Sequence, residues 1–265
     1  MRDILSDIVE NKKNIVAAAK ERQTLHEIKA RVQAGNFAFS HALHAEPWSL
    51  IAECKLQSPS KGRLCHMRTV EDLARIYDAN GASILSVHTD PHFLGSNEDF
   101  RRVRALTKLP LLRKDFIIDP YQIYEARLLG ADAVLLIVRI LTPAQLKSFL
   151  FLTWELGMDA LVEAHDAEDV KIALQTPAEF IGLNNRNLRT FETSIQNTLD
   201  LLPQIPQEGR TIISESGIFT AQDALTLKQA GAHGILVGEG LVRAEDIAKA
   251  TRVLKSIGNE AEQTA

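Results

Sequence analysis

The 265-residue sequence contains only two cysteines, Cys54 and Cys65. Two thiols are too few for a disulfide framework, and their spacing does not match a metal-binding motif. The sequence also lacks an apolar run of roughly 18 residues, the length that a transmembrane helix needs, and its first residues lack the apolar core of a signal peptide. We therefore expect a cytoplasmic protein with reduced thiols and no membrane partner.

A large net charge of either sign is also missing. The formal net charge is -4, and the sequence contains no long run of basic residues. A protein that binds nucleic acid or an anionic membrane surface normally presents a basic patch. The sequence therefore predicts neither of these as the main partner.

Short β-rich apolar runs alternate with amphipathic segments from Ser49 onward, and the sequence contains eight such pairs. Glycine, proline or a short polar loop precedes most of the apolar runs. The predicted strands are 50–55, 83–89, 111–116, 133–138, 160–163, 180–184, 211–215 and 234–237. The predicted helices are 70–79, 97–106, 120–129, 143–156, 167–174, 194–202, 221–230 and 244–257.

Alternating strands and helices require parallel strand pairing, and eight units in this length favour a closed (β/α)8 barrel, the TIM barrel. An open doubly wound sheet is the alternative, but it usually has a glycine-rich turn directly after its first strand. Here the glycine-rich turns follow the last two predicted strands. We therefore predict an α/β fold with a single barrel domain at 49–265. Apolar residues at helical spacing predict a helical extension at 1–48 that packs on the barrel.

The first predicted strand carries opposite charges on one face. Side chains alternate along a strand, so Glu53 and Lys55 point the same way. A polar loop, Ser-Pro-Ser-Lys-Gly at 58–62, follows the carboxyl end of this strand. An isolated pair of this kind is more often a solvated surface ion pair than a catalytic one, so the other strands must decide its interpretation.

Polar residues also gather at the carboxyl ends of the other predicted strands. The same alternation places Lys114, Glu163 and Asn184 on inward faces, while Arg186 and Glu215 lie at the ends of the sixth and seventh strands. Active sites of TIM barrels lie at this end of the barrel. Any one of these residues could be a structural charge. Together with the pair on the first strand, they predict an active site.

Glycines follow the last two predicted strands, in Ser216-Gly217 and in Val237-Gly238-Glu239-Gly240. Glycine lets backbone N–H groups approach an anion, and a helix that begins at the same point adds a favourable dipole. These loops predict a phosphorylated small-molecule substrate. Ordinary turn glycines are the alternative interpretation.

Several of these motifs resemble the indole-3-glycerol phosphate synthase family. The matching segments are 51–55, 58–62, 112–117, 135–138, 161–163, 181–188, 214–218 and 236–241. The resemblance implies a carboxy-lyase of tryptophan biosynthesis. Such an enzyme converts 1-(2-carboxyphenylamino)-1-deoxyribulose 5-phosphate into indole-3-glycerol phosphate, carbon dioxide and water without a metal or organic cofactor. We expect it to be a monomer or a weak homodimer.

The resemblance also implies roles for the charged residues. Lys114 would be the acid that protonates the ketose carbonyl, with a pKa lowered by a cationic and partly dry pocket, and Lys55 could share this role. Glu163 would be the general base or an acid partner. Glu53 and Glu215 would stabilise cationic intermediates.

The remaining candidates would bind the substrate. The residues expected to hold its carboxylate and hydroxyl groups are Ser58, Asn184 and Arg186. The residues expected to hold its phosphate are Lys55 and the backbones of Ser216, Gly217, Gly238 and Glu239. The residues expected to form an apolar wall for its aromatic ring are Phe116, Leu135, Leu188 and Leu236.

Two positions depart from the family pattern. Leu56-Gln57 replaces a basic and a small residue in the first loop, which could change how the loop at 58–60 moves as a flap over the site. His88 replaces an aliphatic residue on the inward face of the second predicted strand, where it could touch the substrate.

Histidines give little sign of a metal site. His88, Asp90 and His92 have a spacing that fits metal ligands, but Pro91 would interrupt the strand and the resemblance implies no metal. His165 and the remaining histidines are expected to be ordinary residues on the surface or behind the site.

Two other functions remain open from the sequence. The phosphate-type loops alone would also fit another sugar-phosphate barrel enzyme, such as an isomerase, although the two lysines and Glu163 argue against it. Alternatively, the chain is a paralogue that binds phosphorylated ligands with altered or no turnover. The retained Glu53, Lys55 and Lys114 argue against an inactive protein.

Overall fold

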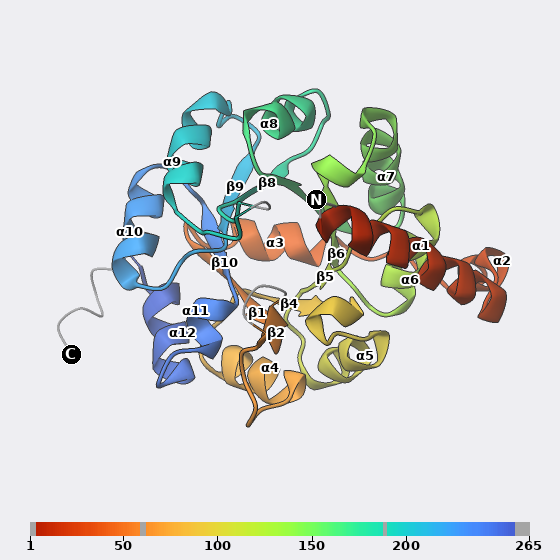
Figure 1. Ribbon diagram of the computed structural model, residues 1–265, viewed down its shortest axis with the longest axis horizontal. Helices are drawn as coiled ribbons and strands as arrows, with labels where there is room; N and C mark the ends of the chain where they lie inside the picture. Colours follow the sequence, from red (N-terminus) through yellow and green to blue (C-terminus); the bar gives the residue numbers. More distant parts are fainter. Residues whose placement is uncertain (1–3, 59–61, 188–189, 258–265) are drawn as a thin grey trace.

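The computed structural model describes residues 4–58, 62–187 and 190–257. Its centre is a closed barrel of parallel strands in the order β1-β10-β9-β8-β7-β6-β5-β4, and helices surround it (Figure 1). The barrel closes because β1 pairs with β10 on one side and with β4 on the other. The predicted TIM barrel is therefore confirmed.

The barrel strands are β1 (Ser49–Cys54), β4 (Ile84–His88), β5 (Leu111–Lys114), β6 (Ala133–Ile137), β7 (Asp159–Ala164), β8 (Phe180–Asn184), β9 (Thr211–Glu215) and β10 (Gly234–Val237). The outer helices are α4 (Val70–Ala79), α5 (Asn97–Leu106), α6 (Pro120–Leu128), α7 (Pro143–Glu155), α8 (Ala167–Leu174), α9 (Gln196–Leu201), α10 (Ala221–Gln229) and α12 (Ile247–Lys255). Every one of these elements overlaps its predicted range. The helix ends differ most at α9 and α12, where the observed helices are shorter.

Several short elements were not predicted, because a few residues give no periodic signal. They are β2 (Gln57–Ser58), β3 (Gly62–Arg63), α11 (Glu239–Val242) and the 3-10 turns η1 (Pro91–Phe93), η2 (Val138–Ile140) and η3 (Leu202–Gln204). The strands β2 and β3 form a small antiparallel hairpin after β1. Most of the flap proposed at 58–60 lies outside the described residues, so its expected motion stays a prediction.

Capping side chains fix where several outer helices begin. Thr69 accepts a hydrogen bond from the backbone N–H of Asp72, and the Asp72 carboxylate accepts one from Thr69, which starts α4. Thr220 and Asp223 form the same capping box at α10. Each cap contributes about 1 kcal/mol by satisfying N–H groups that a helix start leaves without partners.

The strands divide the apolar residues between the inside and the outside of the barrel. Outward side chains pack under the helices in the largest apolar cluster. Inward side chains form a separate cluster, which includes Ile51, Ile84, Leu112, Leu135, Leu161, Phe180, Ile213 and Leu236. Because a strand alternates, the next inward positions toward its carboxyl end are the ones at which the polar candidates stand.

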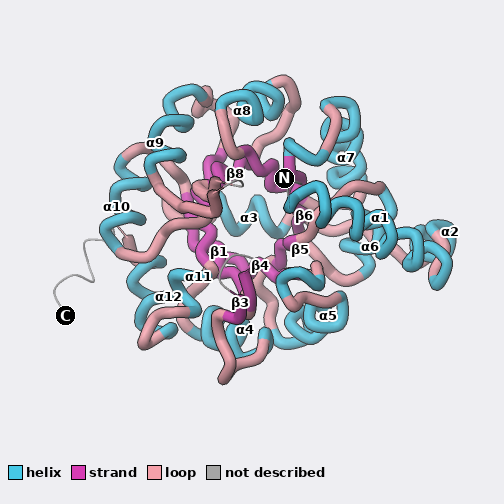
Figure 2. The backbone as a smooth tube through the Cα atoms, viewed as in Figure 1, coloured by secondary structure: helices cyan, strands magenta, loops and turns pink. Residues whose placement is uncertain are grey.

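Three helices precede the barrel: α1 (Ile4–Arg22), α2 (Leu25–Lys29) and α3 (Ala38–His44). Figure 2 shows α3 at the centre of the ring of strands. Its Phe39 packs edge-on against Phe180, the first residue of β8, with ring centroids 5.5 Å apart. The helix therefore closes the amino-terminal end of the barrel.

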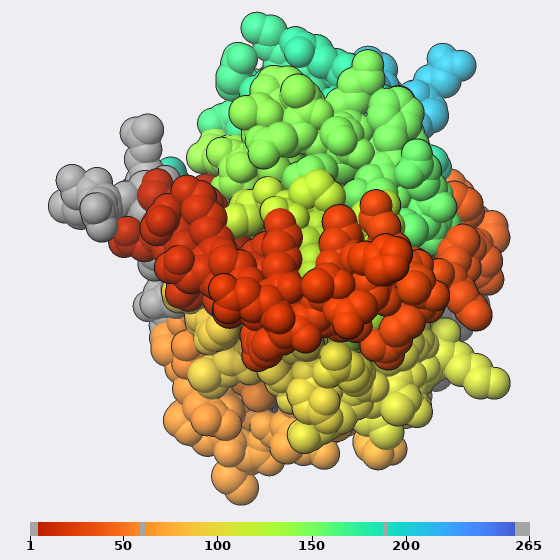
Figure 3. All heavy atoms as spheres, turned by 90° about the vertical axis from the view of Figure 1, so that its right-hand side faces the viewer, coloured from red at the N-terminus to blue at the C-terminus, as the bar shows by residue number. Residues whose placement is uncertain are grey.

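The helix α1 runs along a different part of the barrel. Figure 3 shows the amino-terminal segment in red and orange as a band across one side of the molecule, between the yellow and green parts. At its start, Leu5 and Ile8 reach the cavity at the carboxyl ends of the strands. None of the helices in the described parts of the chain is both long and apolar enough to cross a membrane.

Removing the Phe39 ring tests whether the packing of α3 at the amino-terminal end of the barrel stabilises the fold. Phe39 is fully buried, so Phe39→Ala should lower the free energy of unfolding by about 3–5 kcal/mol through lost burial and a new cavity. Urea unfolding followed by far-UV circular dichroism measures the change. Met67→Ala, at an exposed position, is the matched control and should unfold like the parent. Equal midpoints for Phe39→Ala and the parent would contradict the role of α3.

Candidate active site

A cavity of about 130 Å³ lies at the carboxyl ends of the barrel strands. The sequence candidates that line it are Glu53, Lys55, Ser58, Lys114, Phe116, Leu135, Glu163, Asn184, Arg186, Ser216, Gly217, Leu236, Gly238 and Glu239. Glu215 does not line the cavity but contacts Lys114, which does. The predicted wall residue Leu188 lies outside the described residues. The barrel thus brings together candidates from seven strands and the loops that follow them.

Lys114 occupies the centre of the charged group. Its ammonium lies 2.6 Å from Oε2 of Glu215 and 3.2 Å from Oε2 of Glu163. The three side chains come from β5, β9 and β7, and all three are largely or fully buried. Burial of these charges would cost several kcal/mol without mutual pairing, so the contacts hold all three in place.

The pKa of Lys114 is raised, which makes the predicted lowering wrong. Burial alone would lower the pKa, but the carboxylates of Glu215, Glu163 and Glu53 together outweigh it. The prediction assumed a cationic pocket. The surroundings of this ammonium are anionic instead, so Lys114 carries its proton firmly in the absence of substrate.

The two carboxyl groups beside Lys114 differ in proton affinity. Burial and the charge of Glu163 raise the pKa of Glu215 to about 8, despite the opposing effect of Lys114. Burial also acts on Glu163, but Lys114, His165 and a hydrogen bond from Asn184 lower its pKa. Oε1 of Glu215 has no hydrogen-bond partner within the described part of the chain. Near neutral pH, Glu163 is therefore the ionised member of the pair and Glu215 the protonated one.

Two glycines make room for carboxylates in this layer. A Cβ at Gly182 would lie 2.0 Å from Oε1 of Glu215, and a Cβ at Gly238 would lie 2.1 Å from Oε2 of Glu53. Both distances are far too short for atoms that are not bonded to each other. Glycine at these positions of β8 and at the end of β10 is thus required for both carboxylates to lie where they do.

Glu53 also contacts two other side chains of the cavity wall, His88 and Lys55. Its Oε1 lies 2.8 Å from Nε2 of His88, and its Oε2 lies 3.5 Å from Nζ of Lys55. Burial lowers the pKa of His88, despite the opposing effect of Glu53, so the ring is neutral at neutral pH. Although burial opposes ionisation of Glu53, Lys55 and His88 hold the pKa of its carboxyl well below the usual range. His88 lines the cavity, as its inward position predicts.

One functional candidate was missed from the sequence. His165 lines the cavity and is buried, with Nε2 3.3 Å from Oε1 of Glu163. The expectation that it is an ordinary residue on the surface or behind the site is therefore wrong. The signal was present, because His165 lies two residues after Glu163 and the strand alternation continues to it.

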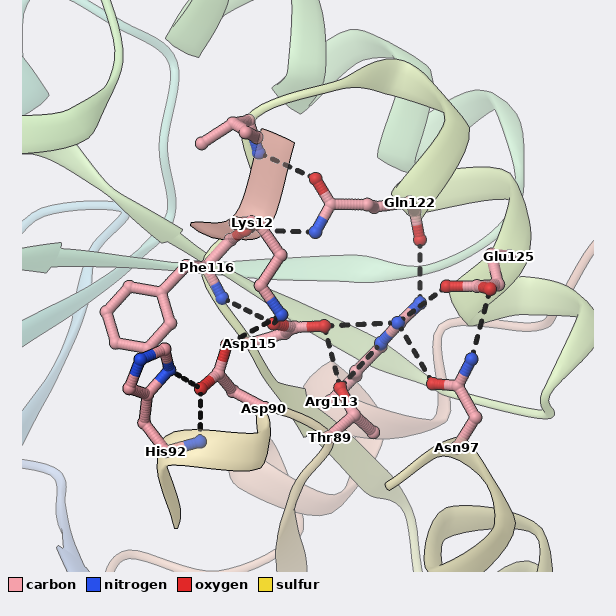
Figure 4. Close-up of polar contacts among 11 residues, drawn as sticks. Lys12, Thr89, Asp90, His92, Asn97, Arg113, Asp115, Phe116, Gln122 and Glu125 are labelled. Carbon is pink, nitrogen blue, oxygen red and sulfur yellow. Dashed lines mark hydrogen bonds and ion pairs between the residues drawn. The ribbon is translucent and has the colours of Figure 1, made fainter. Parts of the chain in front are cut away.

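The side chains of the three residues with metal-type spacing, His88, Asp90 and His92, make contacts within the protein. His88 contacts Glu53, whereas the Asp90 carboxylate contacts His92 and Lys12 (Figure 4). Within the described ranges, no cluster of three histidine, cysteine or acidic residues is arranged to hold a metal ion.

The loop after β9 has an unusual backbone. Ser216 and Gly217 have φ values of 66° and 71°, both in the left-handed region, which costs a serine about 1–2 kcal/mol. Asn185 holds the turn by donating a hydrogen bond of 3.0 Å to the Ser216 carbonyl. Strain maintained in this way at a cavity wall is typical of functional sites.

The opposite part of the cavity is aromatic. Phe93, which the sequence did not single out, stacks on His88 with ring centroids 4.5 Å apart and on Phe116 at 6.1 Å. The ammonium of Lys55 lies 5.2 Å from the Phe93 ring centroid. One wall of the cavity therefore suits a flat apolar ring, and its edge suits an anion.

Comparison with known proteins decides the family. The model of the indole-3-glycerol phosphate synthase family matches residues 5–254. The chain belongs to the indole-3-glycerol phosphate synthase family. This membership agrees with the resemblance found in the motifs.

Individual proteins similar to this chain are also named indole-3-glycerol phosphate synthase. The indole-3-glycerol phosphate synthase of Carboxydothermus hydrogenoformans is 52% identical over 77% of this chain and 78% of its own length. Those of Bordetella pertussis and Alkaliphilus metalliredigens are 47% and 43% identical and cover 93% and 96% of this chain. They are matched over 96% and 98% of their own lengths.

Solved structures show the same fold at low identity. The 3-hexulose-6-phosphate synthase from Salmonella typhimurium superposes with a TM-score of 0.63 over 79% of this chain and 97% of its own, at 15% identity. Orotidine 5'-phosphate decarboxylase from Pyrococcus horikoshii gives a TM-score of 0.57 over 78% and 97% at 15% identity. At this identity the likeness shows the barrel fold alone.

The raised pKa of Glu215 predicts a pH dependence of stability. The folded protein holds this proton more tightly than the unfolded chain, whose glutamate pKa is near 4.5. The proton's stabilising contribution is therefore present at low pH and is lost as the pH rises from about 4.5 through about 8. Glu215→Gln keeps the shape of the protonated group and removes the titration. The free energy of unfolding of the variant should exceed that of the parent increasingly across this range, by on the order of a few kcal/mol at its upper end.

Urea unfolding of both proteins at several pH values between 5 and 9 measures that difference. Glu192→Gln, which alters an exposed carboxylate, is the control and should follow the parent. A difference between Glu215→Gln and the parent that stays constant with pH would contradict the assigned protonation of Glu215.

Proposed function

We propose that this protein converts 1-(2-carboxyphenylamino)-1-deoxyribulose 5-phosphate into indole-3-glycerol phosphate, carbon dioxide and water, as a carboxy-lyase of tryptophan biosynthesis. The observation that carries the proposal is the placement of Lys114 between Glu163 and Glu215 at the wall of a cavity with an aromatic side. This arrangement offers an acid and a base to a substrate whose aromatic ring is held nearby.

Ring closure is the first step. The aromatic carbon that bears the carboxylate attacks the ketose carbonyl carbon, and the carbonyl oxygen takes a proton from Lys114. A lysine with a raised pKa is a weak acid, but the alkoxide that forms on the substrate is far more basic than an amine. The nearby carboxyl of Glu215, with a pKa of about 8, is suited to return a proton to Lys114.

Decarboxylation restores the aromatic ring. The bond between the ring carbon and the carboxylate breaks, carbon dioxide leaves, and the electron pair of that bond returns to the ring. The apolar side chains Phe116, Leu135 and Leu236 would surround the ring and lower the local polarity. A less polar surrounding favours loss of the charged carboxylate as a neutral gas.

Dehydration then completes the pyrrole ring. The hydroxyl group formed at the former carbonyl leaves as water after it accepts a proton, and Lys55, which lines the cavity, would help to supply that proton. Glu163, ionised at neutral pH, takes a proton from the ring carbon next to nitrogen. The cation that exists between these events would be stabilised by Glu53, and by Glu215 once it has passed its proton to Lys114. One proton is consumed in the whole sequence.

Substrate binding would use both rims of the cavity. The strained turn at Ser216-Gly217 and the backbone at Gly238-Glu239 would hold the phosphate, together with Lys55. Ser58, Asn184 and Arg186 would hold the carboxylate and hydroxyl groups. In support of this, Oδ1 of Asn184 accepts a hydrogen bond of 3.0 Å from the backbone N–H of Arg186, which orients the side chain.

The alternatives explain less of the cavity. A sugar-phosphate isomerase would use the phosphate loops but would have no need of the wall formed by Phe93 and Phe116. A paralogue without turnover would have no need of a buried Lys114 between two carboxylates. The cytoplasmic location and the monomeric or weakly dimeric state stay predictions, and we propose a phosphorylated small molecule as the only ligand class that the reaction needs.

The proposal predicts turnover that depends on Lys114. Incubation with the carboxyphenylamino ketose phosphate should produce indole fluorescence. Lys114→Ala should lower kcat/KM by about 10³-fold or more, because it removes both the acid and the charge that pairs with two carboxylates. Lys108→Ala, at an exposed position on the protein surface, is the matched control and should keep the parental rate.

Circular dichroism of each variant separates loss of chemistry from loss of folding. Absence of turnover by well-folded parental protein would overturn the proposed function. Near-normal turnover by Lys114→Ala would remove Lys114 as the acid and leave the function standing.

A further inference from the structure

A lysine in the amino-terminal helix is buried against the barrel. Lys12 of α1 is 2% exposed, whereas Lys13 beside it is 60% exposed. Its ammonium lies 2.7 Å from Oδ2 of Asp90 and 2.6 Å from Oδ1 of Asp115 (Figure 4). A buried lysine costs several kcal/mol unless it is paired, so these two contacts hold α1 in one place on the barrel.

Asp115 links Lys12 to one part of the cavity wall. It directly follows Lys114, and its Oδ1 also accepts a hydrogen bond of 2.8 Å from the backbone N–H of Phe116. Its Oδ2 accepts from Thr89 at 2.7 Å and from Arg113 at 3.1 Å. The carboxylate therefore fixes the backbone from which the Phe116 ring enters the cavity.

Asp90 links Lys12 to the neighbouring part of the wall. Its Oδ1 accepts hydrogen bonds from the backbone N–H and from Nδ1 of His92, which starts the turn η1. Phe93 ends this turn and stacks on Phe116. Asp90 is completely buried, and Lys12 is the cation that faces its Oδ2 among the described residues.

The helix α1 itself supplies a third part of the wall. Leu5, Ile8 and Lys12 follow one another at spacings of three and four residues, so they share one face of the helix. Leu5 and Ile8 line the cavity. The rotation of α1 that lets Lys12 reach both aspartates is therefore the rotation that turns these apolar side chains toward the cavity.

We propose that Lys12 is a positioning residue of the active site: its two buried ion pairs seat α1 over the cavity and hold Phe93 and Phe116 in place at the same time. It does not touch the reacting atoms. The inference rests on the proposed function only for its kinetic readout, because the seating of α1 can be measured without substrate.

Lys12→Met tests this role, because methionine keeps an unbranched apolar side chain and removes the charge. We expect KM for the carboxyphenylamino ketose phosphate to rise about tenfold, with a smaller change in kcat, since the walls that bind the ring are loosened while Lys114 and Glu163 remain. Lys13→Met, the exposed neighbour on the same helix, should leave both constants unchanged. A purely structural role would lower kcat with the folded fraction and leave KM as it was.

A double variant guards against misfolding of the single one. Lys12→Met leaves Asp90 buried without a cation, and Asp90→Asn removes that charge while Asn still accepts a hydrogen bond from His92. Lys12→Met combined with Asp90→Asn should therefore recover stability but keep the raised KM. Recovery of the parental KM in the double variant would overturn the proposal.

Hydrogen exchange without substrate provides the independent test. In Lys12→Met, amides at the start of α1 and in η1 should exchange faster than in Lys13→Met, while those of β7 and β8 should not change. Unchanged exchange in α1 and η1 would overturn the proposal even if the protein had another substrate. If the parent showed no turnover but amides of Lys12→Met still exchanged faster than those of Lys13→Met in α1 and η1, only the proposed function would be refuted.

Discussion

The site depends on one buried ammonium held between carboxylates. Lys114 contacts Glu163 and Glu215, and the three side chains come from strands that are distant in sequence and converge only because the barrel closes. Unpaired, each charge would oppose folding; paired, they form a layer above the apolar interior. Gly182 and Gly238 belong to the same constraint, because any side chain there would displace the carboxylates of Glu215 and Glu53.

The two carboxyl groups of this layer differ in their protonation. Glu163 has several donors around it and stays ionised, whereas Glu215 is buried with an oxygen that lacks a partner in the described residues and takes up a proton. In the proposed reaction Lys114 is the acid, and the base Glu163 and the proton reserve Glu215 both contact it. The amino-terminal helices complete the arrangement, since α3 closes one end of the barrel and α1 lines the cavity at the other.

Strand alternation made much of this arrangement predictable from the sequence. It placed Glu53, Lys114 and Glu163 on inward faces, and the βα rhythm predicted the barrel that unites them. Alternation could not give the sign of the pKa shift at Lys114, because that sign depends on charges contributed by other strands at distances that the sequence does not contain. It also could not reveal Lys12, whose lysine neighbours on α1 are exposed and whose partners lie far along the chain. The same alternation continues from Glu163 to His165 and would have placed His165 on the inward face as well.

The most direct test of the account is the protonation state of Lys114 in the absence of substrate. Nuclear magnetic resonance of the protein with 13C-labelled lysine, titrated with base and assigned with the Lys114→Ala variant, reports the charge on each ammonium. The account predicts that the Lys114 signal stays in its charged position beyond pH 10.5, the ordinary lysine value, because three carboxylates surround it. A Lys114 signal that became neutral below about pH 8 would contradict the account, since a lysine in an anionic layer cannot lose its proton before an ordinary one does.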